Sequence, residues 1–408
     1  MGLIVQKFGG TSLADSSRIK QAARRALDAK RAGNQVIVVV SARGHTTDEL
    51  YALAYDITDN PSSRELDMLV STGEQVSACL LTMALHSLGQ EASSFTAGQI
   101  GILTDSRHTK AKIMHIDPER IRQELERGSI PVVAGFQGVD AQENITTLGR
   151  GGSDTTAVAL AAVFQADVCE IHTDVEGVYT SDPRIVPGAS KLNLLSYDEM
   201  LELASSGANV LQHRAVEFAK KYNVPIMVRS SFNDSPGTII SKEVKAMEDV
   251  MVRGAAVEKS EAKITIRGVP DKPGIAARIL GRVAQQGLNI DMIIQNTSAE
   301  GLTDVTLTVA QSDLKEAIEV FEKLKEEIGA KGVDSDEHIA KISVVGVGMR
   351  THSGVAAKMF QALAKAGINI QMISTSEIKI SCVIDEQMAD EALRAVHKAF
   401  ELEKASTK

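Results

Sequence analysis

The stretch LIVQKFGGTS (residues 3–12) joins a short apolar run to a lysine and two adjacent glycines. The run predicts a strand over residues 3–8, and the residues after the glycines predict a helix that closes at Gly33. Lys7 then lies near a strand end, and the glycines form the turn into a helix N-terminus, where backbone N–H groups and the helix dipole favour an anion. The alternative is a strand–turn–helix whose glycines only satisfy backbone geometry. This stretch by itself does not decide between the two.

Short apolar runs alternate with helical patterns through the first 240 residues. Continuous apolar strands between helices indicate an α/β fold with a mainly parallel sheet covered by helices. Ligands of such sheets bind beyond the carboxyl ends of the strands. We expect strands at 3–8, 35–41, 129–136, 168–174 and 224–230, and helices at about 14–32, 64–88, 109–127, 154–165, 197–206 and 211–222.

The last third of the chain contains a duplication. Residues 274–297 and 354–377 align without a gap, and nine of the 24 positions are identical. Each copy predicts the ferredoxin-like βαββαβ order but needs one more strand. Residues 332–337 can complete the first copy, whereas the second ends in a polar tail. We therefore expect the upstream run VMVRGAAVE (250–258) to complete the second copy, so that the two modules are interleaved.

Domain boundaries follow from these patterns. The turn-rich and then charged segment 231–249 marks the end of the first domain, which we place at residues 1–245. The first repeated module is expected at 262–337 and the second at 338–402.

Composition excludes several function classes. A formal net charge of −9, few aromatic residues and no tryptophan argue against a nucleic-acid surface. The cysteines, Cys79, Cys169 and Cys382, lie far apart and predict small buried side chains in a reducing compartment. We see no apolar stretch of about 20 residues and no signal peptide, so a cytoplasmic protein is expected.

A second glycine cluster, TTLGRGGSDTT (146–156), predicts a tight turn followed by a helix capped by Ser153 or Asp154. A capped helix is a common arrangement and needs no ligand. It does not explain Arg150 beside two glycines, because a guanidinium there presents a fork for a carboxylate. Asp154 would then lie near the strand ends, where it can orient a lysine.

Three further segments carry polar groups at strand or helix ends. HTDVEGVYTSDPR (172–184) is an acidic loop that could accept a nucleotide's ribose and base. SARGHTTDEL (41–50) follows an expected strand, and its polar residues could simply cap a helix. STGEQVS (71–77) contains Glu74, which is ordinarily a helix-surface glutamate. A carboxylate and an arginine in one pocket would suit the ammonium and carboxylate of an amino acid.

The histidines show no metal-ligand spacing. We interpret them as surface or satisfied polar residues and predict no protein-held metal site. Any metal would be Mg²⁺ carried in with a nucleotide.

These motifs occur together in the aspartate kinases (aspartokinases) of the amino-acid kinase family, which this chain closely resembles from about residue 3 to residue 400. The repeated modules resemble the paired ACT domains of the same family. The motifs stand in the family's order: KFGGTS, SARGHTTDEL, STGEQVS, VVAGFQG, TTLGRGGSD, TDVEGVYTSDPR and NVPIMVRSS.

The resemblance implies transfer of the ATP γ-phosphoryl group to the side-chain carboxylate of L-aspartate, with ATP and Mg²⁺ as cofactors and feedback inhibition by lysine or threonine. Lys7 and Asp154 would be catalytic. The implied nucleotide residues are Lys7, Gly9, Gly10, Thr173, Asp174, Tyr179, Asp182 and Arg184. The implied aspartate residues are Ser41, Thr47, Glu74, Arg150, Gly152 and Ser153. The implied effector residues are Asp271, Gly274, Ile275, Ala276, Gln295, Ser298, Asn369, Ile370 and Ser376.

Three positions depart from the family pattern. Arg43 and His45 stand where relatives often carry Met and a small or acidic residue. Asn209 stands where many relatives carry a lysine, which leaves a second phosphate clamp in doubt. A catalytically weak amino-acid sensor, or a kinase of glutamate or a nucleotide, therefore stays an alternative.

The assembly is left open between a homo-oligomer and an α₂β₂ complex. In the second case, translation from Met247 or Met251 would supply a subunit of ACT modules alone.

Overall fold

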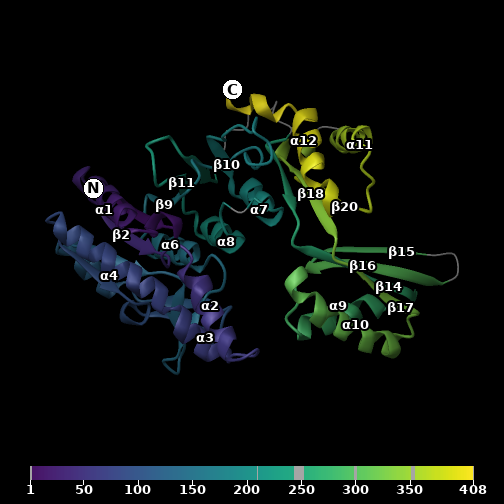
Figure 1. The fold of residues 1–408 in the computed structure, drawn as a ribbon, viewed down its shortest axis with the longest axis horizontal. Helices are drawn as coiled ribbons and strands as arrows, with labels where there is room; N and C mark the ends of the chain where they lie inside the picture. Colours follow the sequence, from purple (N-terminus) through teal and green to yellow (C-terminus); the bar gives the residue numbers. More distant parts are fainter. Residues whose placement is uncertain (1, 209, 243–251, 298–300, 351–353, 408) are drawn as a thin grey trace. The chain divides into compact units, whose positions relative to one another are not determined.

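The computed structural model describes residues 2–208, 210–242, 252–297, 301–350 and 354–407. The chain divides into two compact units (Figure 1). The first comprises Met1–Val178, Lys191–Ala204 and Asn209–Lys245, and the second comprises Tyr179–Ser190, Ser205–Ala208 and Ala246–Lys408. Two short segments that precede residue 209 therefore belong to the second unit.

An eight-stranded sheet forms the centre of the first unit, in the order β10-β12-β11-β9-β1-β2-β6-β3. All neighbouring pairs are parallel except β11 and β12. This confirms the mainly parallel sheet predicted from the apolar runs. The strands are β1 (Leu3–Phe8), β2 (Gln35–Val40), β3 (Ala92–Phe95), β6 (Ile130–Ala134), β9 (Val168–Thr173), β10 (Leu194–Ser196), β11 (Ile226–Ser230) and β12 (Thr238–Ser241).

Helices cover both faces of this sheet (Figure 1). The face that carries Phe8 and Val38 packs against α1 (Ser16–Arg31) and α4 (Thr72–Ser87). Alternation along β1 turns Lys7 to the opposite face, where α6 (Gly152–Val163) packs against β1, β2 and β9 and contacts α8 (His213–Tyr222). The register thus directs Lys7 toward α6 and its first turn. The remaining α-helices of this unit are α2 (Thr46–Ile57), α3 (Ser63–Val70), α5 (Glu119–Glu126) and α7 (Tyr197–Ser205).

The helix predicted over 109–127 is wrong in its first half. That half forms β5 (Ile113–Ile116), which joins a second small sheet in the order β5-β4-β7-β8. Pro118 explains the break, because a proline keeps the preceding residue extended and suits a helix start, and α5 begins directly after it. The other strands of this sheet are β4 (Ile102–Thr104), β7 (Gln137–Val139) and β8 (Ile145–Thr147).

The helix predicted over 64–88 is two helices, α3 and α4, which meet at Ser71. Together they form the stretch Ser63–Ser87, which is long and apolar enough to cross a membrane, a finding that covers the described residues only. Half of its most apolar window is buried, and Leu81 and Leu85 pack into the core beneath the sheet. A core helix meets the same test, so the stretch is weak evidence for a membrane span.

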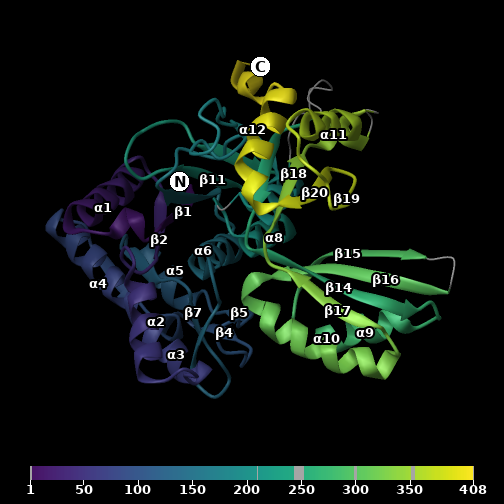
Figure 2. The ribbon, with the colours of Figure 1, turned by 45° about the vertical axis from the view of Figure 1, so that its right-hand side comes forward.

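Two ferredoxin-like sheets make up most of the second unit. The first has the order β15-β16-β14-β17, and α9 and α10 lie together on one of its faces (Figure 2). Its elements are β14 (Glu261–Pro270), α9 (Ile275–Gln285), β15 (Ile290–Thr297), β16 (Leu302–Ala310), α10 (Leu314–Ile328) and β17 (Gly332–Asp336).

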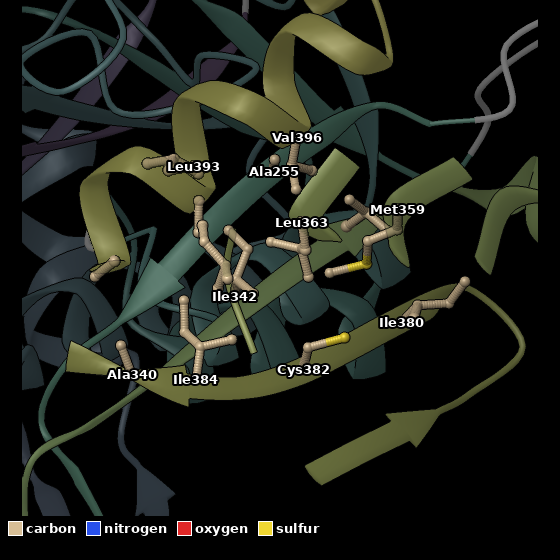
Figure 3. Packing of buried hydrophobic residues seen from close by; sticks show 14 of the residues in the cluster. Ala255, Ala340, Ile342, Met359, Leu363, Ile380, Cys382, Ile384, Leu393 and Val396 are labelled. Carbon is tan, nitrogen blue, oxygen red and sulfur yellow. The ribbon is translucent and has the colours of Figure 1, made fainter. Parts of the chain in front are cut away.

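The second sheet has the order β13-β18-β20-β19. β13 (Gly254–Glu258) precedes the whole first module in sequence, yet it pairs antiparallel with β18, so the modules are interleaved as the fold prediction requires. Apolar residues from β13, β18, β20 and the helices share one core (Figure 3). The other elements are β18 (Ile339–Val345), α11 (Val355–Lys365), β19 (Met372–Thr375), β20 (Lys379–Asp385) and α12 (Ala389–Ala399).

Candidate active site

The carboxyl ends of β1, β2, β9 and β11 meet at one edge of the large sheet. Backbone hydrogen bonds join the loops that leave these strands, because Ser41 N donates to Phe8 O and Gly9 N donates to His172 O. Ser12 and Ser231 add a side-chain hydrogen bond across the same edge at 2.5 Å. The sequence motifs that follow the strands are therefore brought together where parallel sheets bind ligands.

Lys7 and Asp154 form the central ion pair of this edge. The distance between Lys7 Nζ and Asp154 Oδ1 is 2.6 Å, and their side chains are 12% and 8% exposed. Lys7 comes from β1 and Asp154 from the first turn of α6. The structure thus joins the two residues that the sequence analysis named as catalytic.

The glycine turn after β1 differs in part from the expectation. The N–H of Gly9 donates to His172 O at 3.1 Å, so it is used inside the protein and does not point to a ligand. The N–H of Gly10 donates to no carbonyl among the described residues. A Cβ at Gly10 would lie 2.8 Å from Ala42 O, so only glycine fits here. Of the two expected backbone donors, only Gly10 stays available.

Glu74 lies in the first turn of α4 and is almost fully buried. Its Oε1 accepts the N–H of Ala42 at 3.0 Å, while Oε2 has no partner in the described part of the chain. Burial raises the pKa of Glu74 to about 7, although the Ala42 hydrogen bond and the Lys7 charge lower it. Gly73 allows this close fit, because a Cβ there would lie 2.8 Å from that of Ala42. Glu74 is thus a buried acid poised near neutral pH.

Arg150 and the following glycines lead into α6. The Arg150 side chain is exposed, and within the described residues its guanidinium makes no ion pair. The expected cap is wrong: Gly151, at φ 68°, is the N-cap, and the helix begins at Gly152. A Cβ at Gly151 would collide with Gln212, so this residue must be glycine. Ser153 is buried in the first turn.

Ser41 and Thr47 lie on the loop and helix after β2, and both are half-buried. The two departures from the family pattern lie in the same segment. Arg43 donates to Ala14 O at 3.1 Å, and His45 lies 3.6 Å from Asp48 with both side chains exposed. Arg43 therefore has a structural contact of its own. Asn209 lies outside the described residues.

The expected nucleotide residues are divided between the two units. Thr173 ends β9 and donates to Asp174 at 3.0 Å in the first unit. Tyr179, Asp182 and Arg184 belong to the second unit. Arg184 donates to Asp182 through Nε and Nη2, and these hydrogen bonds hold the pKa of Asp182 below its ordinary value.

The expected effector residues lie on the two ferredoxin-like modules. Gly274, at φ 91°, is the N-cap of α9, which begins with Ile275 and Ala276, and Asp271 is exposed just before it. The others include three exposed side chains, Gln295, Asn369 and Ser376, and the half-buried Ile370. Asn369 lines a cavity of about 350 Å³. Ser298 lies outside the described residues.

Some observations were not foreseen. Cys79 is exposed, whereas Cys169 and Cys382 are buried as predicted. His172 is buried and stacks on Phe8 with ring centroids 4.6 Å apart. Asp67 is a fully buried acid in the first unit. Its only sequence signal was an acidic residue between two apolar ones, Leu66 and Met68, in a predicted helix.

Comparisons with family models and with known proteins agree on one family. A model of the amino acid kinase family matches residues 2–230, and ACT domain models match residues 264–326 and 342–400. The aspartokinase of Pseudomonas aeruginosa is 55% identical over 405 residues, which are 99% of this chain and 98% of that protein. The aspartokinase of Corynebacterium glutamicum is 50% identical over 407 residues, which are 98% of this chain and 97% of that protein.

Solved structures agree on the fold. Aspartate kinase from Synechocystis matches 98% of this chain and 69% of its own chain, with 44% identity and a TM-score of 0.54. Escherichia coli aspartokinase III, solved with aspartate and ADP, matches 97% of this chain and 99% of its own, with 24% identity and a TM-score of 0.85.

Proposed function

This chain belongs to the aspartokinases of the amino acid kinase family, and we propose that it transfers the γ-phosphoryl group of ATP to the side-chain carboxylate of L-aspartate. The products are 4-phospho-L-aspartate and ADP, the first step toward lysine, threonine and methionine. A carboxylate oxygen of the substrate forms the new bond to the γ-phosphorus as the bond to the β-phosphate oxygen breaks. The substrate is its own nucleophile, so the protein needs only to position the reactants and stabilise charge.

The buried Lys7–Asp154 pair carries this proposal. A lysine at a strand end, 2.6 Å from one carboxylate, is a fixed cation whose direction is set by its partner. We assign Lys7 to the transferring phosphoryl group, Asp154 to orienting Lys7, and the free Gly10 N–H to a phosphate oxygen. A charge that is already in position before the reaction stabilises the transition state most strongly in a site that excludes water.

Glu74 and Arg150 are assigned to the two ends of the amino acid. The unpartnered Oε2 of Glu74 is an acceptor for the ammonium group, and Arg150 has an uncommitted guanidinium for the α-carboxylate. Ser41, Thr47, Gly152 and Ser153 are assigned to the remaining contacts. A substrate ammonium beside Glu74 would favour the ionised acid, so binding supplies the counter-charge that this buried carboxylate lacks.

Thr173, Asp174, Tyr179, Asp182 and Arg184 are assigned to the nucleotide. Gly9 is assigned there only as a residue without a side chain beside Lys7, because its N–H is already donated to His172 O. Within the described residues, no group of three His, Cys, Asp or Glu side chains could hold a metal ion. We assign Mg²⁺ to the nucleotide phosphates, where it usually binds with few protein ligands. Bound there, Mg²⁺ would neutralise phosphate charge.

The test measures ADP release with aspartate, glutamate or UMP as acceptor, with hydroxylamine present to trap an acyl phosphate. We expect turnover with aspartate and formation of aspartate β-hydroxamate. Turnover with glutamate or UMP alone would assign a different kinase, and no turnover with any acceptor would favour an amino-acid sensor.

For regulation, we assign residues 1–245 to catalysis and the two ACT modules to feedback inhibition by lysine, threonine or both. The start of α9 supports this assignment. The N–H of Ile275 donates to Lys272 O, but those of Ala276 and Ala277 have no backbone acceptor among the described residues and suit an α-carboxylate. Asp271, exposed just before them, is assigned to the ammonium group. Activity measured with each amino acid alone and with both tests it. Full activity under all three conditions would refute it.

The assembly is assigned to a homo-oligomer or to an α₂β₂ complex with an ACT-only subunit. Mass spectrometry of protein from the native gene separates the two, because only the second contains a fragment beginning near Met247 or Met251.

A further inference from the structure

Asp67 is a buried carboxylate to which the proposed reaction gives no role. It lies on α3, and its side chain is 1% exposed. Three donors converge on it: Thr147 Oγ1 at 2.5 Å, His108 Nδ1 at 2.8 Å, and the N–H of Thr109 at 3.0 Å. Removing a carboxylate from water costs free energy unless hydrogen bonds replace the water. With three donors in place, the Asp67 side chain and the segments that supply these donors are held rigidly.

These donors belong to two separate segments that Asp67 fastens together. His108 and Thr109 lie in the loop between β4 and β5, whereas Thr147 is the last residue of β8. A second clamp supports the first, because Arg214 donates to Leu148 O at 3.0 Å and to Ala111 O at 2.9 Å. The chain just before Arg150 is therefore held on both sides.

The backbone in this region leaves little freedom. Thr109 has a φ of 66°, which is unfavourable for a residue with a branched side chain. Gly149, at φ 79°, passes so close that a Cβ there would lie 3.0 Å from Thr109 O. Asp67 accepts the N–H of Thr109 and so fixes the strained residue on which Gly149 rests.

Arg150 follows Gly149 directly and has no comparable anchor on its side chain. The side chain is exposed and makes no ion pair within the described ranges, so the backbone of residues 147–151 sets its position. Asp67 and Glu74 also lie seven residues apart on the continuous stretch formed by α3 and α4. That stretch thus presents Glu74 directly and fixes the base of the Arg150 loop through Asp67.

We propose that Asp67 is a positioning residue for Arg150: by tying Thr147 and Thr109 together, it sets where the guanidinium meets the substrate's α-carboxylate. This inference rests on the proposed function, which assigns Arg150 to aspartate. The competing view is that Asp67 only stabilises the unit. The two views differ in which Michaelis constant changes.

The experiment compares Asp67→Asn with the wild-type chain in the aspartate-dependent assay. The amide loses one acceptor and presents N–H groups to existing donors, so the loop should shift while the side-chain volume is kept. A displacement of about 1 Å at a binding group can cost about 100-fold, so we expect KM for aspartate to rise about 10- to 100-fold. KM for ATP should stay unchanged.

Glu124→Gln is the matched control. Glu124 is a buried carboxylate of the same unit that accepts Ser93 Oγ at 2.9 Å and lies 3.6 Å from Arg127. Among the described residues it makes no hydrogen bond or ion pair with residues 147–151. It should change neither KM. Thr147→Val, which removes only one donor to Asp67, should reproduce a smaller selective rise and serves if Asp67→Asn does not fold.

A double-variant comparison separates positioning from stability. If Asp67 acts through Arg150, Asp67→Asn should add no further rise in KM for aspartate to the Arg150→Ala variant. Equal rises in both Michaelis constants, or a full further rise in the Arg150→Ala background, would overturn the inference. Failure of the proposed function is visible in the wild-type chain alone, as absent turnover with aspartate, so the two failures are distinguishable.

Discussion

Each unit contains a buried lysine, and the two are built differently. Lys7 lies at the end of β1, is 12% exposed, and faces one carboxylate, Asp154, at 2.6 Å. Lys341 lies within β18, is 1% exposed, and faces two carboxylates, Glu261 and Asp291, each at 2.5 Å. Burial lowers the pKa of Lys341, but the two carboxylates raise it above its ordinary value overall.

The number of carboxylate partners and the exposure of the side chain distinguish Lys7, which can bind a ligand, from Lys341, which stabilises the fold. Two carboxylates more than neutralise Lys341, and they come from β14 and β15, so the lysine joins the two ACT modules. Among the described residues, Lys7 has one ion-pair partner and lies beside a turn where the Gly10 N–H has no acceptor, and its side chain stays partly open to solvent. Burial of a lysine alone is therefore a poor sign of function, whereas its position at a strand end and its partner count are informative.

The largest expected effect is on catalysis by Lys7. Lys7→Ala should lower kcat by about 10²- to 10³-fold, the cost typical of losing one preorganised group that stabilises transition-state charge. Steady-state kinetics, with circular dichroism to establish folding, measure it. A folded variant with nearly normal kcat would show that Lys7 has no catalytic role, so that Lys7 and Lys341 would not differ in function.

Lys341→Ala should produce the opposite pattern. It leaves Glu261, which is 12% exposed, without its counter-charge, whereas Asp291 is about one-third exposed and can be solvated. We expect stability to fall by about 2–3 kcal/mol, somewhat less than for a fully buried pair. Denaturant unfolding measures this loss, and kcat under folding conditions should stay near normal. A large drop in kcat with unchanged stability would contradict the structural assignment.

The smallest effect is the pH dependence of aspartate binding through Glu74. Its pKa is raised to about 7, so the free protein holds a proton on Glu74 below that pH and presents a carboxylate above it. An ammonium group needs the carboxylate, so KM for aspartate should rise about tenfold between pH 8 and pH 6. Glu74→Gln should flatten the profile. A wild-type profile already flat over this range would exclude Glu74 as the ammonium partner.

Much of the fold, including the position of Lys7, could be predicted from the sequence because it follows from patterns along the chain. The apolar runs indicated the central strands, and the extent of the first run placed Lys7 near a strand end. The duplicated pattern, lacking one strand in the second copy, predicted that residues 250–258 would complete the second module, and β13 does so by pairing with β18. These features depend on periodicity and counting, which a single chain displays directly.

The features that could not be predicted from the sequence depend on contacts between segments that are distant in the chain. Lys341 lies in an apolar run, and nothing in the sequence indicates which carboxylates approach it. Asp67 was hidden for the same reason, because its donors come from two other segments. The N–H of Gly9 was expected to be free, but His172 O from β9 takes it. The first half of the helix predicted at 109–127 is instead β5, because pairing with β4 outweighed local helical periodicity there.

The most direct test of the central claim is kcat for the double variant Lys7→Ala with Asp154→Ala. Asp154 is proposed to act only through Lys7, and the effects of residues that act as a unit are strongly non-additive. The double variant should therefore be no slower than Lys7→Ala alone. A kcat lowered by the product of the two single effects would show that the residues act independently and would contradict the account.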